Sequence, residues 1–356
     1  MKKTLKIVLT GGGTAGHVMP HIALLPDMKD RNWLVSYIGS SGIEKKLMKE
    51  QGIPFYEIPT GKLRRYLSVE NFTDLFKILG GIFASFRHLI KLKPDVVFSK
   101  GGFVSVPVSV AARLLSIPVV THESDVTPGL ANKLIAPLAS KIIYAFPETA
   151  RYLPSAKSIS GGIPVRKELH NGSRSKALSL CGFTEEDTRP VILCMGGSQG
   201  AKSLNEAIEK ALPELSQRFR IIHLTGSGKS LSISHEAYKG FEFVSEELKD
   251  LLSLADIVLG RAGANSIFEL LELRKPMILV PLVAGSRGDQ ILNAQSFAKE
   301  GWAIVLEEKN LNPDSLSSTL DQLLAKKDIF IESMNKNRSL QSVELTMNVL
   351  SKFQKE

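Results

Sequence analysis

Cysteine is scarce in this sequence, which has two residues of this type, Cys181 and Cys194, among 356. Two thiols cannot form a disulfide framework, and these two do not stand at a spacing typical of metal ligands. The sequence therefore predicts buried thiols in a protein of a reducing compartment, with no structural zinc site.

Long hydrophobic runs are also missing, since no uninterrupted stretch of about 18 apolar residues occurs. The first residues, MKKTLKIVLTGGG, are basic and then briefly apolar, but they lead into glycines and not into a small-residue cleavage site. We therefore expect a first strand here, no signal peptide, and a protein that stays inside the cell without a membrane-spanning helix.

Acidic residues are fewer than basic ones, 36 against 45, which gives a formal net charge of +9. This excess favours an anionic partner, which is a nucleic acid, an anionic membrane or a phosphorylated small molecule. No nucleic-acid recognition motif accompanies the charge, so we expect no nucleic-acid partner.

Short apolar runs alternate with helix-like stretches along the chain, a pattern typical of parallel sheets covered by helices on both faces. It predicts an α/β fold. KPDVVFSKGG resembles LADIVLGRAG, and GGGTAG resembles GGSQGA, which indicates two Rossmann-like domains with a cleft between them. The stretch ISGGIPVRKE, rich in glycine and proline, suggests domains at 1–163 and 164–337, with a last helix at about 338–356 packed back on the first. The expected strands are LKIVLT, WLVSYIG, DVVFSK, PVVTHE, KIIYAF, PVILCMG, RIIHLTG, DIVLG, PMILVPL and AIVLEE.

The segment from Lys62 to Lys93 is apolar and basic at once, with seven Lys or Arg against two acidic residues. Its apolar side chains stand at helical spacing on one face, interrupted by Gly80 and Gly81. Such a helix suits an anionic membrane surface, and Arg64 and Arg65 favour this interpretation. The alternative, of about equal weight, is a domain helix whose apolar face packs on the core. The residues of this face are Leu75, Ile78, Leu79, Ile82, Phe83 and Phe86.

Glycines follow the first predicted strand at the Gly-x-Gly-x-x-Gly spacing, as Gly11, Gly13 and Gly16. This spacing lets a backbone approach a pyrophosphate, as in NAD-dependent oxidoreductases. Those enzymes also need an acidic residue at the end of the second strand. That strand is predicted to end at Gly39, and Glu44 comes too late, so the oxidoreductase is the weaker interpretation.

The sequence GSGKS at 226–230 invites comparison with the phosphate-binding loop of ATPases. That loop needs a glycine where this chain has His223, so we expect a solvated turn.

Two turns in the second half are suited to bind an anion at a helix start. One is Gly196 to Gly200, and the other is RAGANSIFELLE, which places Glu269 about one turn into its helix. Helix-start N–H groups stabilise phosphate oxygens, and a carboxylate accepts ribose hydroxyls, so we predict a nucleoside-diphosphate site. The alternative for Glu269 is an acid that only stabilises its own helix.

Seven motifs, in order and over nearly the whole chain, resemble those of the MurG family of glycosyltransferases. They are GGGTAGHVMP, KGGFVSVPV, THESDVTPGLANK, GGIPVRKE, GGSQGAKSLN, RAGANSIFELLELRKPMILVPL and GDQILNAQ.

The resemblance implies a two-domain GT-B fold and an inverting β-1,4 transfer of N-acetylglucosamine (GlcNAc) from UDP-GlcNAc. The implied acceptor is the MurNAc 4-hydroxyl of undecaprenyl-pyrophosphoryl-MurNAc-pentapeptide, in the step from lipid I to lipid II of peptidoglycan synthesis. The resemblance also implies no metal, no cofactor and peripheral attachment to the cytoplasmic face of the inner membrane. A transferase acting on another lipid, such as diacylglycerol, would share the fold and the donor.

The resemblance also assigns site residues. Thr14, Ala15 and Gly16 match loop positions that reach the donor sugar, with Ala15 where the family has glycine. His17 matches a histidine that is either the catalytic base or a donor to the diphosphate, and Glu123 is a second candidate base. The other donor-binding positions are Arg166, Ser198, Val244, Ala264, Asn265, Ser266, Ile267, Phe268, Glu269 and Gln290.

One motif departs from the family. Many members read HEQN where this chain reads His122, Glu123, Ser124 and Asp125. The asparagine that contacts the donor in those members is therefore Asp125 here. A carboxylate accepts hydrogen bonds from sugar hydroxyls but cannot donate one, and we keep Asp125 as a predicted contact.

Overall fold

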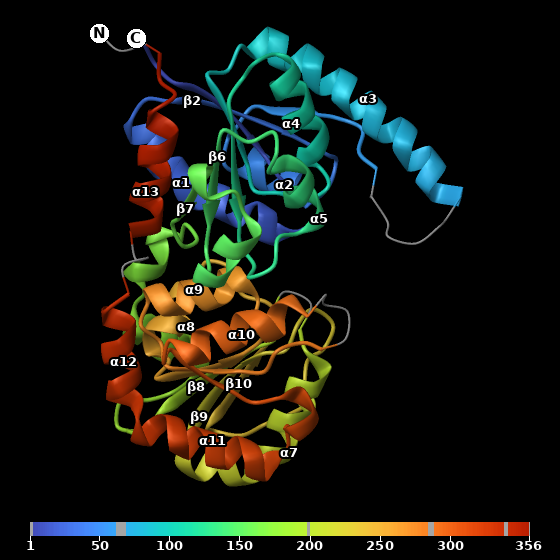
Figure 1. Cartoon of the computed structure of the whole chain (residues 1–356). Coiled ribbons are helices and arrows are strands. Elements are labelled where there is room, and N and C mark those ends of the chain that lie inside the picture. Colours follow the sequence, from blue (N-terminus) through green and yellow to red (C-terminus); the bar gives the residue numbers. More distant parts are fainter. Residues whose placement is uncertain (1–2, 62–68, 198–199, 284–287, 338–340, 356) are drawn as a thin grey trace. The chain divides into compact units, whose positions relative to one another are not determined.

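The computed structural model describes residues 3–61, 69–197, 200–283, 288–337 and 341–355 (Figure 1). The chain divides into two compact units, each with its own sheet. Unit 1 consists of Met1–Arg166 and Ser339–Glu356, and unit 2 of Lys167–Arg338. The predicted α/β architecture of two parallel-sheet domains is confirmed.

Unit 1 is built on a seven-stranded sheet of order β3-β2-β1-β4-β5-β6-β7. All neighbouring strands are parallel. The direction of winding reverses between β1 and β4, and loops that follow strands at such a point diverge and leave room for a ligand. The strands are β1 Lys6–Thr10, β2 Leu34–Gly39, β3 Phe55–Glu57, β4 Val96–Ser99, β5 Val119–Glu123, β6 Lys141–Tyr144 and β7 Ser158–Ser160.

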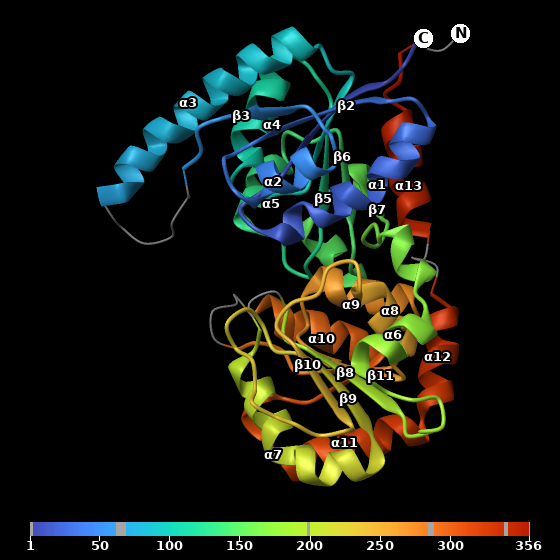
Figure 2. The same cartoon turned by 180° about the vertical axis from the view of Figure 1, so that it is seen from behind.

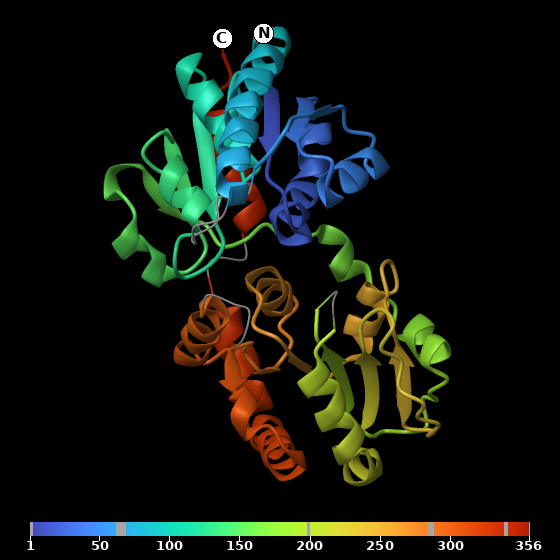
Figure 3. The same ribbon diagram turned by 90° about the vertical axis from the view of Figure 1, so that its right-hand side faces the viewer.

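Unit 1 is closed by the last helix of the chain, α13 (Ser342–Ser351), which lies against α1 (Met19–Asp30) (Figures 1 and 2). Leu24, Met28, Met347 and Leu350 share one buried cluster. The two chain ends lie together as well (Figure 3), where the Gln354 amide donates to the Lys3 carbonyl at 2.8 Å. The other helices of this unit are η1 Ala15–His17, α2 Ile43–Glu50, α3 Val69–Leu92, α4 Ser105–Leu114, α5 Leu130–Ile135, η2 Pro147–Tyr152 and η3 Ser155–Lys157.

Unit 2 is built on a six-stranded parallel sheet of order β10-β9-β8-β11-β12-β13, which reverses its winding between β8 and β11. Helices α7 and α11 cover one face, and α8, α9 and α10 cover the other (Figure 1). The strands are β8 Val191–Met195, β9 Arg220–Leu224, β10 Tyr238–Phe241, β11 Ile257–Gly260, β12 Met277–Leu279 and β13 Ala303–Val305. The helices are η4 Lys167–Asn171, α6 Arg174–Cys181, α7 Lys202–Arg218, α8 Leu248–Leu254, α9 Ala264–Glu272, α10 Asp289–Lys299, η5 Glu308–Asn310, α11 Pro313–Ala325 and α12 Lys327–Asn335.

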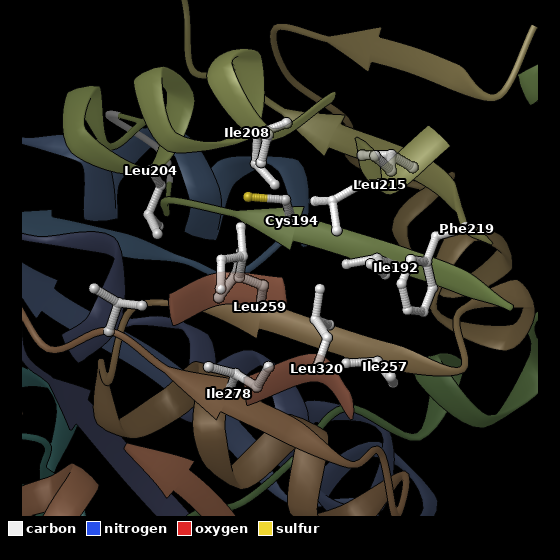
Figure 4. Close-up of a cluster of buried hydrophobic side chains, with 14 of the residues drawn as sticks. Ile192, Cys194, Leu204, Ile208, Leu215, Phe219, Ile257, Leu259, Ile278 and Leu320 are labelled. Atoms are coloured by element: carbon white, nitrogen blue, oxygen red, sulfur yellow. The ribbon is translucent and has the colours of Figure 1, made fainter. Parts of the chain in front are cut away.

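The core of unit 2 fills the space between α7 and the central strands (Figure 4). Leu204, Ile208 and Leu215 recur on one face of α7 and meet side chains such as Ile192 and Cys194 of β8. Burial raises the pKa of the Cys194 thiol to about 12, so this thiol is uncharged and packs as a small apolar group. Cys181 is buried too, so the prediction of two buried thiols is confirmed.

Three strands were not predicted, namely β3, β7 and β10. Each is an outer strand of its sheet and only three or four residues long. An outer strand packs on one neighbour and keeps more polar residues, so its apolar signal is weaker.

Helix α3 differs from its prediction in two respects. It is one continuous helix that runs through Gly80 and Gly81. Gly81 lets the backbone of Pro59 approach the helix closely, since a Cβ there would lie 2.5 Å from the Pro59 carbonyl oxygen. The predicted apolar face is also divided. Ile82 and Phe86 pack on the core, whereas the exposed fraction of Phe83 is 74%. Leu79 and Leu75 lie one and two turns before Phe83 and are more than half exposed. Lys62, Arg64 and Arg65 lie outside the described residues.

None of the helices in the described parts of the chain is long and apolar enough to cross a membrane.

Candidate functional site

The loops that follow β1 and β4 in unit 1 lie directly against each other. A Cβ on Gly102 would lie 2.4 Å from the carbonyl oxygen of Gly12 and 3.1 Å from Nδ1 of His17. Gly102 also has a φ of +76°, a conformation that glycine adopts without strain. The motifs GGGTAGH and KGGF therefore form one surface at the point where the winding of the sheet reverses.

His17 lies in η1 at this surface, together with Thr14. The Thr14 hydroxyl and Nδ1 of His17 are 3.1 Å apart, which is hydrogen-bond distance. Thr14 is exposed and His17 half-buried, so both side chains reach the surface of unit 1. Ala15 and Gly16 complete the same turn. The first half of the predicted site is thus one local structure, in which the hydroxyl orients the imidazole ring.

Glu44, at the start of α2, is fully buried against the glycine loop. Its carboxylate accepts N–H hydrogen bonds from Gly13 at 3.3 Å and Ser40 at 3.1 Å. The carboxylate thus occupies the place where a dinucleotide would put its pyrophosphate, and it would repel that group. The position of Glu44 in the sequence is too late for the predicted ribose contact, and the sequence did not predict its hydrogen bonds to the glycine loop. The geometry disfavours the NAD-dependent oxidoreductase.

Glu123 ends β5, and its carboxylate is buried under the following loop. One oxygen accepts the N–H groups of Ser124 and Asp125 at 2.9 and 3.0 Å. The other accepts from the Gly129 N–H at 3.0 Å and the Asn132 amide at 2.8 Å. Four donors engage both oxygens, which leaves neither aimed at an acceptor hydroxyl. This geometry does not fit the predicted role of second catalytic base and assigns Glu123 to holding the loop.

Asp125 lies two residues beyond β5 and is half-buried. Its backbone is held on both sides, since its N–H donates to Glu123 and its carbonyl accepts from the Thr149 hydroxyl at 3.2 Å. The residue that departs from the family motif therefore stands in a fixed loop.

A cavity of about 660 Å³ opens in unit 2 where the winding of its sheet reverses. Its walls include Gly196, Gly200 and Gly263, from the loops after β8 and β11. A Cβ on Gly200 would lie 2.0 Å from the Thr225 carbonyl oxygen, so a side chain there would force the loop apart. The N-cap residues of α7 and α9, Ala201 and Gly263, make no side-chain cap hydrogen bond. Two helix starts thus meet at one cavity, an arrangement that favours an anion.

Arg261 lines this cavity and forms an ion pair with Glu308. Its guanidinium also donates to the Ser203 hydroxyl at 2.9 Å and the Val280 carbonyl at 3.1 Å. Burial opposes the charge of Glu308, but hydrogen bonds from Ser203 and Arg261 outweigh burial and lower its pKa. The loop after β11 is thereby fastened to α7 and η5. The sequence did not predict the contacts among Arg261, Ser203 and Glu308, because Glu308 is distant from the other two in the sequence and lies in none of the motifs.

The predicted donor-binding residues fall into three groups. Ser266 and Gln290 line the cavity, where Gln290 accepts from the Leu282 N–H at 3.0 Å. Ala264, Asn265, Ile267, Phe268 and Glu269 belong to the first two turns of α9, but they are not among the residues that line it. Val244 lies in the loop after β10, also away from the lining, Arg166 is the last residue of the first segment of unit 1, and Ser198 lies outside the described residues.

Among the residues that the structure describes, no group of three or more His, Cys, Asp or Glu side chains is arranged to hold a metal ion.

Comparisons with known proteins agree with this geometry. The profile of the glycosyltransferase family 28 N-terminal domain matches residues 7–144, and that of the family 28 C-terminal domain matches residues 191–349. Both reversal points described above lie within these matches.

Two relatives carry the name "UDP-N-acetylglucosamine--N-acetylmuramyl-(pentapeptide) pyrophosphoryl-undecaprenol N-acetylglucosamine transferase". The protein of Lachnospira eligens is 50% identical over 350 residues, which cover 97% of this chain and 98% of the relative. The protein of Clostridium botulinum strain Alaska E43 is 50% identical over 355 residues, which cover 99% of both. The crystal structure of Acinetobacter baumannii MurG matches with a TM-score of 0.74 at 26% identity and covers 98% of this chain and 99% of that one. This chain belongs to glycosyltransferase family 28 and is a glycosyltransferase of the MurG type.

Proposed function

We propose that this enzyme transfers GlcNAc from UDP-GlcNAc to the MurNAc 4-hydroxyl of undecaprenyl-pyrophosphoryl-MurNAc-pentapeptide, with inversion at the anomeric carbon. The observation that carries the proposal is identity of 50% over nearly the full length to relatives named for this reaction. The anion-suited cavity of unit 2 supports the donor half of the proposal.

The donor binds in unit 2, with its diphosphate at the starts of α7 and α9. Helix-start N–H dipoles are already oriented there and stabilise the charge that the UDP leaving group gains. The start of α9, Ala264 to Phe268, holds the phosphates through its backbone N–H groups, Glu269 accepts the ribose hydroxyls, and the backbone of Val244 meets uracil. Arg166 and Gln290 contact the rest of the donor.

The acceptor hydroxyl is deprotonated in unit 1. His17 is the base, because histidine is the side chain that most often acts as a general base and the Thr14 hydroxyl lies within hydrogen-bond distance of its ring. Thr14, Ala15 and Gly16 reach the donor sugar, as does Asp125. Unit 1 is the acceptor domain and unit 2 the donor domain.

The enzyme attaches peripherally to the cytoplasmic face of the cell membrane. Support comes from α3, where Leu75, Leu79 and Phe83 form an exposed apolar row. The exposed residue Arg87 lies one turn after Phe83 and continues this row on the same helix. Apolar burial and attraction to anionic lipids add on such a surface, which matches a lipid-linked acceptor.

Calorimetric titration with UDP-GlcNAc tests the donor assignment. Wild type is expected to bind, and Glu269→Ala is expected to bind about tenfold more weakly, because hydrogen bonds to a charged group contribute more than 1 kcal/mol. Glu272→Ala, one turn further along α9, is the matched control and should bind as wild type does.

Unchanged affinity in Glu269→Ala would remove the ribose assignment, and no binding by wild type would remove the donor. The acceptor is tested separately by offering lipid I and diacylglycerol with UDP-GlcNAc. Transfer to diacylglycerol alone would contradict the proposed reaction.

A further inference from the structure

Lys100 is a deeply buried lysine near the loops of unit 1, with an exposed fraction of 1%. It follows β4 directly, and its backbone N–H donates to the Thr10 carbonyl of β1. It thus stands at the reversal point of the sheet, beneath the glycine loop, where Gly11 would place a Cβ 3.2 Å from the Cβ of Lys100. Neither the proposed reaction nor the family motifs give this side chain a role.

The Lys100 ammonium group is held by two partners, one in the neighbouring strand β5 and one in the loop that follows it. It lies 2.8 Å from Nδ1 of His122 and donates to the Ser124 hydroxyl at 2.6 Å. Nε2 of His122 is 2.7 Å from the Gly162 carbonyl, which can only accept. His122 therefore carries its proton on Nε2, and its Nδ1 accepts from Lys100.

The surroundings of Lys100 contain two acidic and two basic groups. Burial and the charge of Lys100 keep the pKa values of His21 and His122 well below the ordinary value, so both rings are uncharged near neutral pH. Burial also lowers the pKa of Lys100 to about 7, while the charges of Glu123 and Asp125 act in the opposite direction. The buried ammonium therefore depends on these carboxylates.

The two carboxylates differ in their hydrogen bonds. Glu123 is held by four donors within its own loop, as described above. Asp125 stands where many family members have an uncharged asparagine, and the residue before it, Ser124, is bonded to Lys100. A carboxylate in the path of a donor with a charged diphosphate would repel that donor, unless a positive charge lies nearby.

We propose that Lys100 and Asp125 form a compensating pair in the transfer site, in which the buried ammonium positions the loop after β5 and offsets the carboxylate of Asp125. The inference rests on the proposed transfer from a UDP-sugar. Lys100 is a positioning residue, since its ammonium group is bonded to His122 and Ser124 and acts on the loop that carries Asp125.

A double-mutant cycle tests the pair. Lys100→Met alone leaves the carboxylate uncompensated, and kcat/KM should fall about tenfold. Asp125→Asn alone leaves the ammonium without its counter-charge and should also reduce kcat/KM. The double variant removes both charges and should recover to within about threefold of wild type. Lys133→Met, an exposed lysine of α5, is the matched control and should keep wild-type activity. If the fold-reduction in kcat/KM of the double variant equals the product of the two single reductions, the proposal is overturned.

The pH dependence of kcat/KM separates the effect of the Lys100 charge from that of its hydrogen bonds. An uncharged Lys100 amine still has two N–H groups, which can donate to His122 and Ser124. Activity of wild type should decline as the pH rises through about 7, where Lys100 loses its proton. This limb should be absent in Lys100→Met. In Asp125→Asn it should move to lower pH, because the carboxylate that raises the Lys100 pKa is gone. A limb that keeps its position in all three proteins would overturn the pair.

A readout that needs no activity keeps this inference separate from the proposed function. The pKa of Lys100, followed by the NMR shift of its labelled Cε, should fall in Asp125→Asn whether or not the wild type transfers GlcNAc. An inactive wild type with this shift would contradict the proposed function alone. An unchanged Lys100 pKa in an active enzyme would contradict the pair alone. Coupling in the free energy of unfolding without coupling in kcat/KM would reduce the pair to a structural contact and overturn its role in transfer.

Discussion

At the scale of single residues, the structure gives two carboxylates of unit 1 tasks that their motifs did not reveal. Glu44 and Glu123 are both buried, and both accept N–H groups of loops beside the reversal point of the sheet. Each carboxylate accepts hydrogen bonds from backbone N–H groups that are not bonded within a strand or helix and would otherwise need water. The loops that carry His17 and Asp125 are thus fixed by buried acids.

Glu44 offers a direct measure of this support. Glu44→Ala would leave the N–H groups of Gly13 and Ser40 without their acceptor, which should lower the free energy of unfolding of unit 1 by about 2 kcal/mol. Urea unfolding followed by the fluorescence of Trp33 reports on unit 1 alone when Trp302, the only other tryptophan in the sequence, is replaced by Phe.

Glu50→Ala is the matched control for that measurement. Glu50 is an exposed acid of the same helix with a loose pairing to Lys46, and its loss should change the free energy by less than about 0.5 kcal/mol. Equal effects of the two substitutions would mean that the contacts of Glu44 with the loop contribute nothing.

Sequence reasoning found contacts between neighbouring residues of one motif and missed contacts that the fold makes between residues far apart in the sequence. Thr14 and His17 lie three positions apart, so one turn brings them together. Arg261 and Glu308 are 47 positions apart, and only the packing of η5 on the loop after β11 joins them. Lys100 was overlooked for the same reason, since its partners lie on the next strand.

At the scale of elements, α3 has apolar residues on a buried face and on an exposed face. One face packs Ile82 and Phe86 on the core, while another exposes Leu79 and Phe83. A soluble helix rarely exposes a row of this kind without a partner for it. The spacing alone did not predict which apolar residues are buried and which are exposed. Apolar residues cover more of the helix surface than the one face that packs on the core.

Replacement of both Leu79 and Phe83 by Ser should weaken binding to vesicles that contain anionic phospholipid by at least about tenfold, since each removes more than 1 kcal/mol of apolar burial in the membrane. Sedimentation with vesicles measures the change. The thermal midpoint should stay near that of wild type, because both side chains are exposed.

Ile329→Ser is the matched control, since Ile329 is an exposed apolar residue of α12 in unit 2. It should leave vesicle binding unchanged. Equal losses in both proteins, or none in either, would return α3 to the role of an ordinary domain helix.

The strands show the same limit of sequence reasoning. All central strands were predicted, because a strand covered on both faces is a continuous apolar run, as in VVFS of β4 and VILCM of β8. The missed strands are edge strands with few aliphatic residues, as in SIS of β7, whereas the edge strand β13 was predicted from its apolar residues AIV. An apolar run indicates a strand because it indicates burial, and strands at the edge of a sheet are the least buried.

At the scale of the whole molecule, unit 1 is assembled from both ends of the chain, whereas unit 2 is one continuous segment. Removal of 342–356 would take Met347, Val349 and Leu350 out of the core of unit 1. The unfolding transition of unit 1, followed by Trp33, should shift to lower urea, because loss of several buried side chains destabilises by more than about 3 kcal/mol.

Unit 2 should respond differently to the same truncation. Its transition, followed by Trp302 in a Trp33→Phe background, should not move, and calorimetry should still detect binding of UDP. A shift of both transitions together would show that the two units unfold as one.

The return of α13 to α1 also sets an order in time. The core of unit 2 needs residues only up to α12, so its residues leave the ribosome before α13 does. The first half of the chain, although synthesised earlier, must wait with the apolar surface of α1 uncovered until α13 has emerged. The domain proposed to meet the membrane is therefore the last to mature, and a nascent chain acquires its nucleotide cavity before its acceptor surface.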